Sequence, residues 1–535
     1  MSEFNEEALQ AYPLANITPP LNWKLVALED VSADVRPGFA SGNHNSDGTG
    51  LPHLRPMNVD RDGQINLNVV KSVAGSNGIE LRAGDVLFNN TNSAELVGKT
   101  AAVSVRESGF AFSNHMTRIR LESGVNSIFA ARQLHFLWMT GYTRHRCTNH
   151  VNQASVSSKT LAKSIPFLLP PTTEQTRIVD RLEGLLSDLD AGVAELKAAH
   201  KKLALYRQLI LQAAVEGALT ADWRAQHPAA ETGVQLLARI LADRRSRWEA
   251  GQLAKFKEQG KPAPPGWQKK YLEPKVLTTS KFTNLLPGEW CEATTALAGT
   301  VLLGRQRAPQ YLTGRFPRKY LRVANIKDNW IDFSDIESMD FDEVHFEKYQ
   351  LSPGDILVSE GQSPELVGQS AIFLGHQEPL CFQKTLHRFR ALPGVALPEY
   401  AQLVFRSHVY TGLFRAIASI TTNIAHLTLE KFEAAPFPLP PVAEQAEIVA
   451  IADFQLGRIA AMKRDIEKGL AQSNAQRQNI LRAAFAGRLV PQDRTDEPAS
   501  VLLARIRAER AARESAGKRS RAAAGGALNL AVARP

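Results

Sequence analysis

Two long stretches of the chain repeat large aliphatic residues at a spacing that predicts helices. In the first stretch every seventh residue is a large aliphatic one: Leu182, Leu189, Leu196, Leu203 and Ile210. A companion series is smaller but mostly apolar, and consists of Ile178, Leu185, Gly192, Ala199, Tyr206 and Ala213. A heptad pattern of this kind is typical of a helix that packs along another helix. We therefore expect a first spacer helix over 172–217, about 65–70 Å long.

The second stretch, 442–487, has a less regular apolar stripe. The stripe consists of Leu456, Ile459, Ile466, Leu470, Ile480 and Leu481. Each stretch follows a Pro-Pro pair, at 170–171 and 440–441, and proline suits the first turn of a helix. Because neither stripe can remain exposed to water, the simplest expectation is that the two helices pack on each other. The alternative is two unrelated surface helices, each packed on its own domain.

The stretches before these helices have a different pattern. Short β-branched and aromatic runs, such as 86–88 and 356–358, alternate with Gly, Pro, Asn and Asp. Runs of this length, bounded by turn-forming residues, are typical of strands. The pattern predicts two mixed α/β domains, each with a twisted sheet, over about 21–170 and 288–440.

The chain also carries an internal repeat of about half its length. The stretch 81–88, Leu-Arg-Ala-Gly-Asp-Val-Leu-Phe, is matched by 351–358, Leu-Ser-Pro-Gly-Asp-Ile-Leu-Val. Further matched pairs are 20–23 with 287–290, 54–58 with 321–325, 95–98 with 365–368, 118–120 with 388–390, 169–175 with 439–445, and 236–240 with 502–506. The pairs keep one order, and their offset drifts by only a few residues. The sequence therefore predicts a tandem duplication with pseudo-twofold symmetry.

The repeat and the hydrophobic patterns together divide the chain into seven segments. They are an N-terminal extension (1–20), a first α/β domain (21–171), a first spacer helix (172–217), a helical segment and linker (218–287), a second α/β domain (288–441), a second spacer helix (442–487), and a C-terminal helical segment with a basic tail (488–535). The linker is expected at the proline-rich stretch 261–266.

Composition narrows the class of protein. At 535 residues the chain is too long for one core, and its 44% hydrophobic and 22% charged content is that of an ordinary globular protein. No window approaches 18 uncharged apolar residues, as a membrane-spanning helix would need. The acidic first residues lack a signal pattern, so a cytoplasmic location is expected. Cys147, Cys291 and Cys381 are widely spaced, which excludes a disulfide framework and a structural zinc site.

The net charge of +9 suggests a nucleic-acid partner, but its distribution weakens that argument. Residues 501–535 carry eight Lys or Arg and two Glu, so the rest of the chain carries only about +3. A basic tail is commonly a solvated terminus. Charge alone therefore does not predict DNA binding.

Motifs that would carry catalysis are incomplete. The triplet at 98–100, Gly-Lys-Thr, resembles the end of a phosphate-binding loop, but position 93 is Ser where that motif needs Gly. The segment 144–150 holds two His and one Cys at a spacing that no common zinc site uses. No dinucleotide or S-adenosylmethionine fingerprint is evident. Because the two halves share mainly Gly, Pro, Asp and Leu, a duplicated recognition scaffold is favoured over an enzyme.

Taken together, the matched blocks resemble the specificity (S) subunit of a type I restriction–modification enzyme over nearly the whole chain. The blocks that carry the resemblance are Leu-x-x-Gly-Asp-hydrophobic-Leu at 81–87 and 351–357, each followed by Leu-Val-Gly, the Pro-Pro-x-x-Glu-Gln segments at 170–175 and 440–445, and the Ala-Ala-x-x-Gly-x-Leu helix ends at 213–219 and 483–489. The one departure is that the second copy has Pro438 before Leu439, where the first copy has Leu168.

The resemblance implies an α+β fold. Two similar mixed α/β target-recognition domains would be joined by two long antiparallel coiled-coil spacer helices. Each domain would read one half of a bipartite site in double-stranded DNA. The chain itself would be a non-catalytic subunit of a restriction endonuclease and DNA adenine methyltransferase. It would recruit two methyltransferase (M) and two restriction (R) subunits, and S-adenosylmethionine, ATP and Mg would bind those partners rather than this chain.

The residues expected to contact DNA are polar side chains with paired donors and acceptors, as base reading requires. In the first domain they are Arg55, Asn58, Asn89, Asn90, Thr91, Asn92, Ser93, Lys99, His115, Arg118, Asn152 and Gln153. In the second they are Arg322, Asn325, Ser359, Gln362, Ser363, Gln369, Lys384, Thr385, His387, Arg388 and Asn423. The shared Arg118 and Arg388 are assigned to phosphate contact or structure, because both copies have them. Lys99 is expected to contact phosphate.

Two other functions stay open at this point. The chain could be an interaction scaffold that holds partner proteins apart and never reads DNA. It could also be a stand-alone nuclease or methyltransferase whose site the motifs do not reveal. For any single polar residue in the two sets above, a turn cap or a solvated side chain is the plainer interpretation.

Overall fold

The two copies of the repeat fold into similar successions of strands and helices, and the second adds β16 (Ile326–Lys327), β17 (Trp330–Ile331) and α9 (Glu343–Tyr349). The computed structural model describes residues 4, 6–76, 78–151, 153–273, 286–421 and 423–531. The chain divides into two units: unit 1 comprises Met1–Leu196 and Lys468–Pro535, and unit 2 comprises Lys197–Glu467. We call the α/β part of unit 1 head 1 and that of unit 2 head 2.

Head 1 is built from short strands around one four-stranded antiparallel sheet. Its elements are α1 (Glu6–Leu9), β1 (Lys24–Ala27), β2 (Ser32–Pro37), β3 (Leu51–Leu54), β4 (Lys71–Val73), β5 (Val86–Asn89), β6 (Thr91–Asn92), β7 (Thr100–Ala102), β8 (Ala111–Phe112), β9 (Met116–Leu121), α2 (Ser127–Met139), α3 (Tyr142–Arg146), β10 (Thr148–Asn149), β11 (Ala154–Ser155), α4 (Ser158–Ser164) and β12 (Pro166–Leu169). The main sheet has the order β2-β9-β5-β7, and smaller sheets are β4-β3-β8, β10-β11-β6 and β1-β12.

Head 2 repeats this plan. Its elements are β13 (Cys291–Thr294), α8 (Thr295–Ala298), β14 (Gly299–Leu303), β15 (Pro317–Leu321), β16 (Ile326–Lys327), β17 (Trp330–Ile331), β18 (Glu337–Asp340), α9 (Glu343–Tyr349), β19 (Ile356–Ser359), β20 (Gly361–Gln362), β21 (Ser370–Ile372), β22 (Cys381–Phe382), β23 (Leu386–Ala391), α10 (Pro398–Tyr410), α11 (Leu413–Ile417), β24 (Ser419–Thr421), β25 (Ile424–His426), α12 (Leu429–Glu433) and β26 (Pro436–Leu439). The order β14-β23-β19-β21 matches the main sheet of head 1, and β18-β15-β22, β20-β25-β24 and β13-β26 match its smaller sheets.

The repeated Gly-Asp block holds the main sheet of each head together. Asp85, just before β5, accepts the backbone N–H of Arg82 at 2.8 Å and pairs through both oxygens with Arg120 of β9, at 2.7 and 2.8 Å. In head 2, Asp355 accepts the N–H of Ser352 and pairs in the same way with Arg390, at 2.6 and 2.8 Å. Both carboxylates are 1% exposed. The sequence repeats this block because it closes the same turn twice.

A second repeated contact fastens each head to a long helix. In head 1 the indole Nε1 of Trp23 donates to Glu174 Oε2 at 2.9 Å, and in head 2 Trp290 donates to Glu444 Oε2 at 2.9 Å. Glu174 lies in α5 (Thr172–Glu216) and Glu444 in α13 (Val442–Phe485). The Pro-x-x-Trp and Pro-Pro-x-x-Glu-Gln blocks therefore form one joint, used once in each unit.

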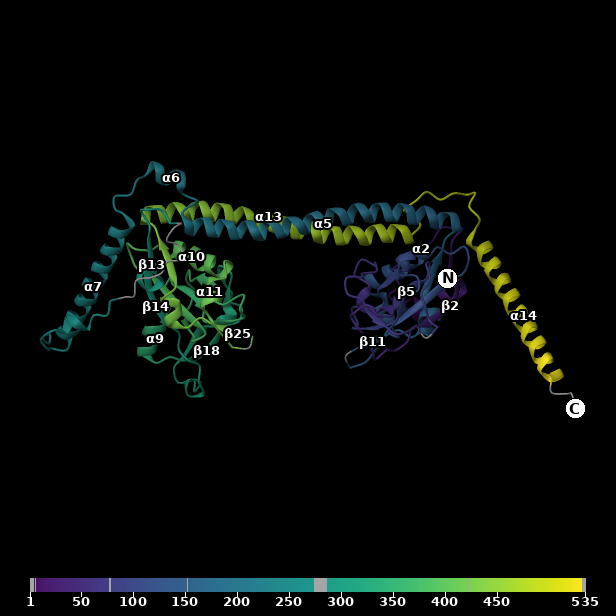
Figure 1. The fold of residues 1–535 in the computed structure, drawn as a ribbon, viewed down its shortest axis with the longest axis horizontal. Helices are drawn as coiled ribbons and strands as arrows, with labels where there is room; N and C mark the ends of the chain where they lie inside the picture. Colours follow the sequence, from purple (N-terminus) through teal and green to yellow (C-terminus); the bar gives the residue numbers. More distant parts are fainter. Residues whose placement is uncertain are drawn as a thin grey trace. The chain divides into compact units, whose positions relative to one another are not determined.

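Within each unit, segments of α5 and α13 lie side by side and run antiparallel (Figure 1). In unit 1, Arg477 pairs with Asp190, and Leu196 is the side chain nearest to Gly469. In unit 2, Leu211 of α5 shares a core cluster with Ala452 of α13. As the residue number rises along α5, the residue number of the contact on α13 falls, so the two helices are antiparallel.

The twelve expected seam residues lie on the covered side of these helices. Ile178, Leu182, Ile210, Ile459, Ile466 and Ile480 are buried, and Leu185, Leu189, Leu196, Leu203, Leu456 and Leu470 are half-buried. The companion position Tyr206 is 57% exposed, so that part of the pattern is wrong. A straight helix drifts by about 20° per heptad from a strict seven-residue repeat. Leu186 and Leu211, outside the heptad series, are buried where the helices also pack on the heads.

Three further helices follow the two long ones along the described chain. The segment 218–287 contains α6 (Ala221–Gln226) and α7 (Gly233–Glu258) in unit 2, and the basic C-terminal segment contains α14 (Ala499–Ala531) in unit 1. Leu236 and Ile240 of α7 join the core of head 2, and Leu502 and Ile506 of α14 join that of head 1. The first part of the basic tail therefore packs on head 1.

Candidate nucleic-acid interface

Three segments of head 1 meet at one edge of its main sheet. They are the loop between β2 and β3, the turn between β8 and β9, and the β10–β11 hairpin with β6. The carbonyl of His115, in the turn, accepts the N–H groups of Asn90 and Thr91, which lead into β6. β6 then pairs with β11, with Asn92 opposite Ala154. The backbone thus joins the turn, β6 and the hairpin into one surface.

Head 2 joins the equivalent segments by equivalent bonds. The carbonyl of Thr385, in the turn between β22 and β23, accepts the N–H of Glu360 next to β20. β20 pairs with β25, with Gln362 opposite Ala425. We call the surface formed by these segments and the β14–β15 loop the head 2 edge, and its counterpart the head 1 edge.

The loops that complete the two edges start from identical anchors. In head 1, Gly38 N donates to Met116 O and Phe39 N to Phe112 O, and Phe39 O accepts from Asn114 N, at 3.1–3.2 Å. In head 2, Gly304, Arg305 and Lys384 donate in the same pattern, at 2.8–3.2 Å. A Cβ on Gly38 would lie 2.1 Å from Phe112 O, and one on Gly304 would lie 2.2 Å from Gln383 O. Only glycine allows this close approach.

Some of the expected DNA-contacting residues lie on these edges. Of the expected residues that the structure describes, Ser93, His115, Gln153, Lys384 and Asn423 are exposed, and Arg55, Thr91, Asn92, Arg322, Gln362, Ser363, Gln369, Thr385 and Arg388 are half-buried. Asn152 lies outside the described residues. Gln369 lines a pocket beside α10 instead of an edge. The guanidinium of Arg322 forms ion pairs with Asp335 and Glu337, so it is not free to contact a base.

Eight of the expected residues are buried, which corrects their assignment to DNA contact. They are Asn58, Asn89, Asn90, Lys99, Arg118, Asn325, Ser359 and His387. The Asn58 side chain accepts the N–H of Arg55 and donates to two backbone carbonyls, each at 2.9 Å, and Asn325 repeats this pattern. Asn89 donates to Pro56 O at 2.9 Å, and Asn90 to Asn114 O at 3.0 Å. These side chains satisfy backbone groups inside the heads.

Lys99 and the two shared arginines also have structural roles. The Nζ of Lys99, 6% exposed, donates to the carbonyl of Val59, so the expected phosphate contact is wrong. Arg118 donates to Glu80 O at 3.0 Å and pairs with Asp34. Arg388 donates to Lys348 O and Gln350 O, at 3.3 and 3.2 Å. For Arg118 and Arg388, the structural alternative stated from the sequence is the one observed.

His387 gives head 2 a pH-dependent stability. Its Nε2–H donates to Leu427 O at 2.7 Å, and burial lowers its pKa to about 4. An unfolded histidine has a pKa of about 6.5. Between pH 6.5 and 4 the unfolded chain therefore binds a proton at this residue, whereas the folded head does not. The contribution is complete above pH 6.5 and is lost as the pH falls toward 4, by up to about 1.4 kcal/mol per pH unit. Urea unfolding of unit 2 between pH 8 and 5 should show this slope, and His387→Gln should flatten it. Equal slopes in both proteins would contradict this assignment.

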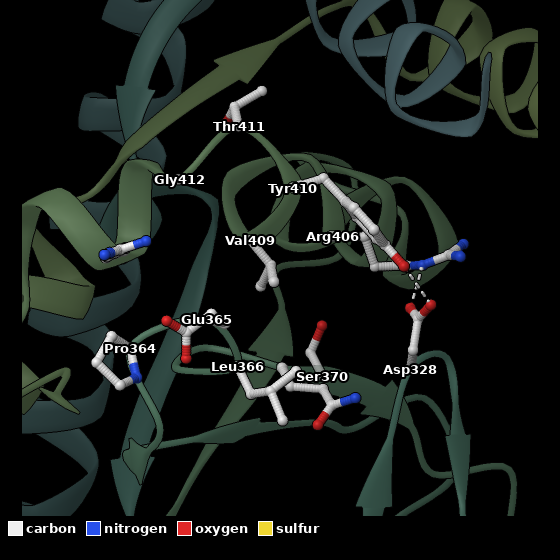
Figure 2. Close-up of a pocket in the computed structure, with 12 residues that line it drawn as sticks. Asp328, Pro364, Glu365, Leu366, Ser370, Arg406, Val409, Tyr410, Thr411 and Gly412 are labelled. Atoms are coloured by element: carbon white, nitrogen blue, oxygen red, sulfur yellow. Dashed lines mark hydrogen bonds and ion pairs between the residues drawn. The ribbon is translucent and has the colours of Figure 1, made fainter. Parts of the chain in front are cut away.

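Figure 2 shows a pocket of ≈ 420 Å³ in unit 2, where Tyr410 and Arg406 of α10 point toward Asp328. Asp328 accepts from Tyr410 Oη at 2.7 Å and Arg406 Nε at 3.1 Å, and it also pairs with Arg207 of α5. Burial would raise the pKa of Asp328, but the two guanidiniums and the Tyr410 hydroxyl outweigh it and keep the pKa below its usual value. Burial and Asp328 raise the pKa of Tyr410 to about 12. At neutral pH this cluster is a fixed ion pair that joins head 2 to α5, not an acid–base pair.

The described residues contain no candidate metal cluster and no candidate membrane-spanning helix. No three His, Cys, Asp or Glu side chains among them gather in a way that could hold a metal ion. None of the helices they form has the length and apolarity needed to cross a membrane.

The fold therefore defines a duplicated protein whose two heads share a framework and differ at one polar edge, each head being fastened to an antiparallel helix pair. Residues 20–198 and 310–470 match the family model described as the type I restriction modification DNA specificity domain. This chain belongs to that family. The tandem arrangement and the α+β fold predicted from the sequence are confirmed.

Named relatives agree with this assignment. The chain is 26% identical over 363 residues to the type I restriction enzyme EcoKI specificity subunit of Escherichia coli K12; the match covers 66% of this chain and 65% of that protein. It is 32% identical over 177 residues to the StySPI specificity subunit of Salmonella potsdam, which covers 31% of this chain and 37% of that protein. A chain solved in a study of complex assembly and conformational transition of the type I R-M system has the same fold, with a TM-score of 0.58 and 19% identity over 88% of this chain and 99% of that one.

Proposed function

We propose that this chain is the specificity subunit of a type I restriction–modification enzyme and reads a bipartite site in double-stranded DNA. The observation that carries the proposal is that the two heads share one framework but differ in the side chains at their edges. The two heads repeat the same anchors, ion pairs and sheets, yet their exposed edges carry different polar side chains. Two different readers on one framework suit a site with two different halves.

The long helices supply the second part of the proposal. A pair of packed helices is stiff, whereas a flexible linker would allow many separations between the heads. We propose that α5 and α13 fix the number of unread base pairs between the two half-sites. The chain itself performs no chemistry in this proposal. It recruits two methyltransferase subunits, which bind S-adenosylmethionine, and two restriction subunits, which use ATP and Mg.

Mapping methylated bases tests the proposal. The chain is produced with its methyltransferase subunit in a host that lacks other methylation, and modified bases are located across the genome. We expect two short defined sequences separated by an unread gap of constant length. A single uninterrupted target, methylation without sequence preference, or DNA cleavage by the isolated chain would contradict the proposal, and the last outcome would support a stand-alone nuclease.

A further inference from the structure

The loops that begin at the shared glycine anchors differ in their charged and aromatic residues. Variable loop 1 comprises residues 40–50 and variable loop 2 comprises residues 306–316; each runs from its anchor to the start of the next strand, β3 or β15. Both have eleven residues. Variable loop 1 is Ala-Ser-Gly-Asn-His-Asn-Ser-Asp-Gly-Thr-Gly and carries one acidic residue, whereas variable loop 2 is Gln-Arg-Ala-Pro-Gln-Tyr-Leu-Thr-Gly-Arg-Phe and carries two arginines and no acid.

Both loops return to the framework at the same place. β3 runs parallel to β8, with Leu54 opposite Phe112, and β15 runs parallel to β22, with Leu321 opposite Phe382. The two ends of each loop are therefore fixed by equivalent bonds, and only the residues between them are free to differ. This is the design expected of an element that varies its readout while the domain stays constant.

One carboxylate binds the last four residues of variable loop 2. Asp340, at the end of β18, accepts the N–H groups of Thr313 at 2.8 Å, Gly314 at 3.1 Å and Phe316 at 2.8 Å, and the Thr313 hydroxyl at 2.6 Å. In the middle of the loop, the Tyr311 ring stacks on the buried guanidinium of Arg305, which lies 4.2 Å from the ring centroid. A loop fixed at both ends and in its middle loses little entropy when it binds.

Variable loop 2 exposes two arginines, and one of them has no carboxylate partner among the described residues. Arg315 is exposed and has no carboxylate partner among the described residues; its guanidinium lies 5.2 Å from the Phe316 ring centroid. Arg307, the other arginine of the loop, is 3.7 Å from Glu337 Oε2. An unpaired guanidinium on a rigid loop can form two parallel hydrogen bonds to O6 and N7 of guanine, the commonest specific contact in the major groove.

Variable loop 1 offers a different donor and acceptor set. Asn45 and Asp47 are occupied within the loop, because the Asn45 amide donates to Thr49 O and the Asp47 carboxylate accepts the Thr49 N–H, both at 2.9 Å. Asn43 is exposed, and no bond of its side chain occurs within the described residues. An asparagine amide pairs with N6 and N7 of adenine rather than with guanine.

We propose that variable loops 1 and 2 carry the sequence preference of the two heads, and that Arg315 reads a guanine in the half-site of head 2. The proposal rests on the proposed function and specifies which residues perform it. In head 1 the exposed side chain without a bond in its loop is Asn43, near the start of variable loop 1, and its amide favours adenine.

The experiment uses the full chain in complex with its methyltransferase subunit, after the wild-type target has been mapped. Affinity is measured for DNA duplexes in which each position of the head 2 half-site is replaced in turn. For the wild type, replacing one guanine should weaken binding about 10- to 100-fold. Arg315→Ala should bind the intact site about 10- to 100-fold more weakly and no longer distinguish bases at that position, with the other half-site unaffected.

Arg315→Lys separates base reading from phosphate contact. Lysine keeps the charge but lacks the planar fork, so it should lose discrimination at the same position as the alanine variant. Arg245→Ala, an exposed arginine of α7 paired with Glu249, is the matched control and should leave discrimination intact. Asn43→Ala should relax one position of the other half-site only.

Three results would overturn this inference while the proposed function stands. They are a head 2 half-site without guanine, an Arg315→Lys variant that discriminates like the wild type, and an Arg315→Ala variant that weakens all sequences equally with a shallower salt dependence. Unfolding midpoints of the variants, measured beside the wild type, show whether a loss of binding reflects loss of folding. Failure of the proposed function would instead appear as a wild-type complex without a bipartite site.

Discussion

Glu444→Ala is expected to lower the free energy of unfolding of unit 2 by about 3–5 kcal/mol, the usual cost of removing one partner from a buried charged cluster. Glu444 is 2% exposed and accepts from the Trp290 indole at 2.9 Å, the Thr220 hydroxyl at 2.7 Å and Arg224 Nε at 2.9 Å. Alanine leaves the guanidinium and two further donors without their acceptor. Urea unfolding followed by tryptophan fluorescence measures the loss.

Matched variants show whether the charge causes this loss. Glu174→Ala removes the equivalent carboxylate from unit 1, where the partners are Trp23 and the neutral amide of Gln492. Its cost should be smaller, about 1–3 kcal/mol, because no guanidinium is left unpaired. Glu195→Ala, on the exposed side of α5, should change stability by less than about 0.5 kcal/mol. A Glu444→Ala protein as stable as the Glu195→Ala protein would contradict the structural role of this joint.

Exchange of one head is expected to replace one half-site completely and to preserve the other. The exchange takes residues 24–169, from the start of β1 to the end of β12, from another member of the family. It leaves Trp23 and Glu174 in place, so the joint with α5 is retained. Because the core of head 1 is formed within unit 1 and that of head 2 within unit 2, head 2 should keep its readout.

The methylated bases of the hybrid complex measure the outcome. We expect one new half-site, one unchanged half-site and a gap of unchanged length. Re-inserting the original residues 24–169 into the hybrid is the control and should restore the original target. A change in both half-sites would show that the heads do not read independently.

The framework was predictable from the sequence because its physical constraints occur twice. Asp85 with Arg120, and Asp355 with Arg390, close the same turn, so selection for that turn leaves the same letters in both halves. The helix seam was predictable from periodicity, because each turn of a helix pair buries its apolar residues at the same spacing. Where the helices also pack on a head, Leu186 and Leu211 are buried outside the heptad positions, since a third layer covers more of the helix surface than a two-helix seam.

The DNA-contacting edge was less predictable, because polarity alone does not reveal which way a side chain points. Asn89 and Ser359 end the central strands β5 and β19, where every position is buried. The repeat does not reveal the variable loops, because the matched blocks lie on either side of them and not within them. A signal was present: between matched blocks of equal spacing, 304–322 contains six basic residues and no acidic one.

The core of head 1 is completed by residues beyond 480, which are synthesised about 300 residues after the head itself. Phe485 lies in its core against Phe129, a Cβ on Gly487 would meet Pro20 at 2.4 Å, and Arg510 and Arg513 of α14 reach Glu122. Head 2 is closed by α5, α6 and α7, which are translated before it, and by the first part of α13, which follows it directly. As the chain leaves the ribosome, head 2 can therefore finish folding first, while head 1 waits with an uncovered apolar face for about 300 further residues. A chaperone that shields head 1 during this interval would act on the part of the protein that was made earliest.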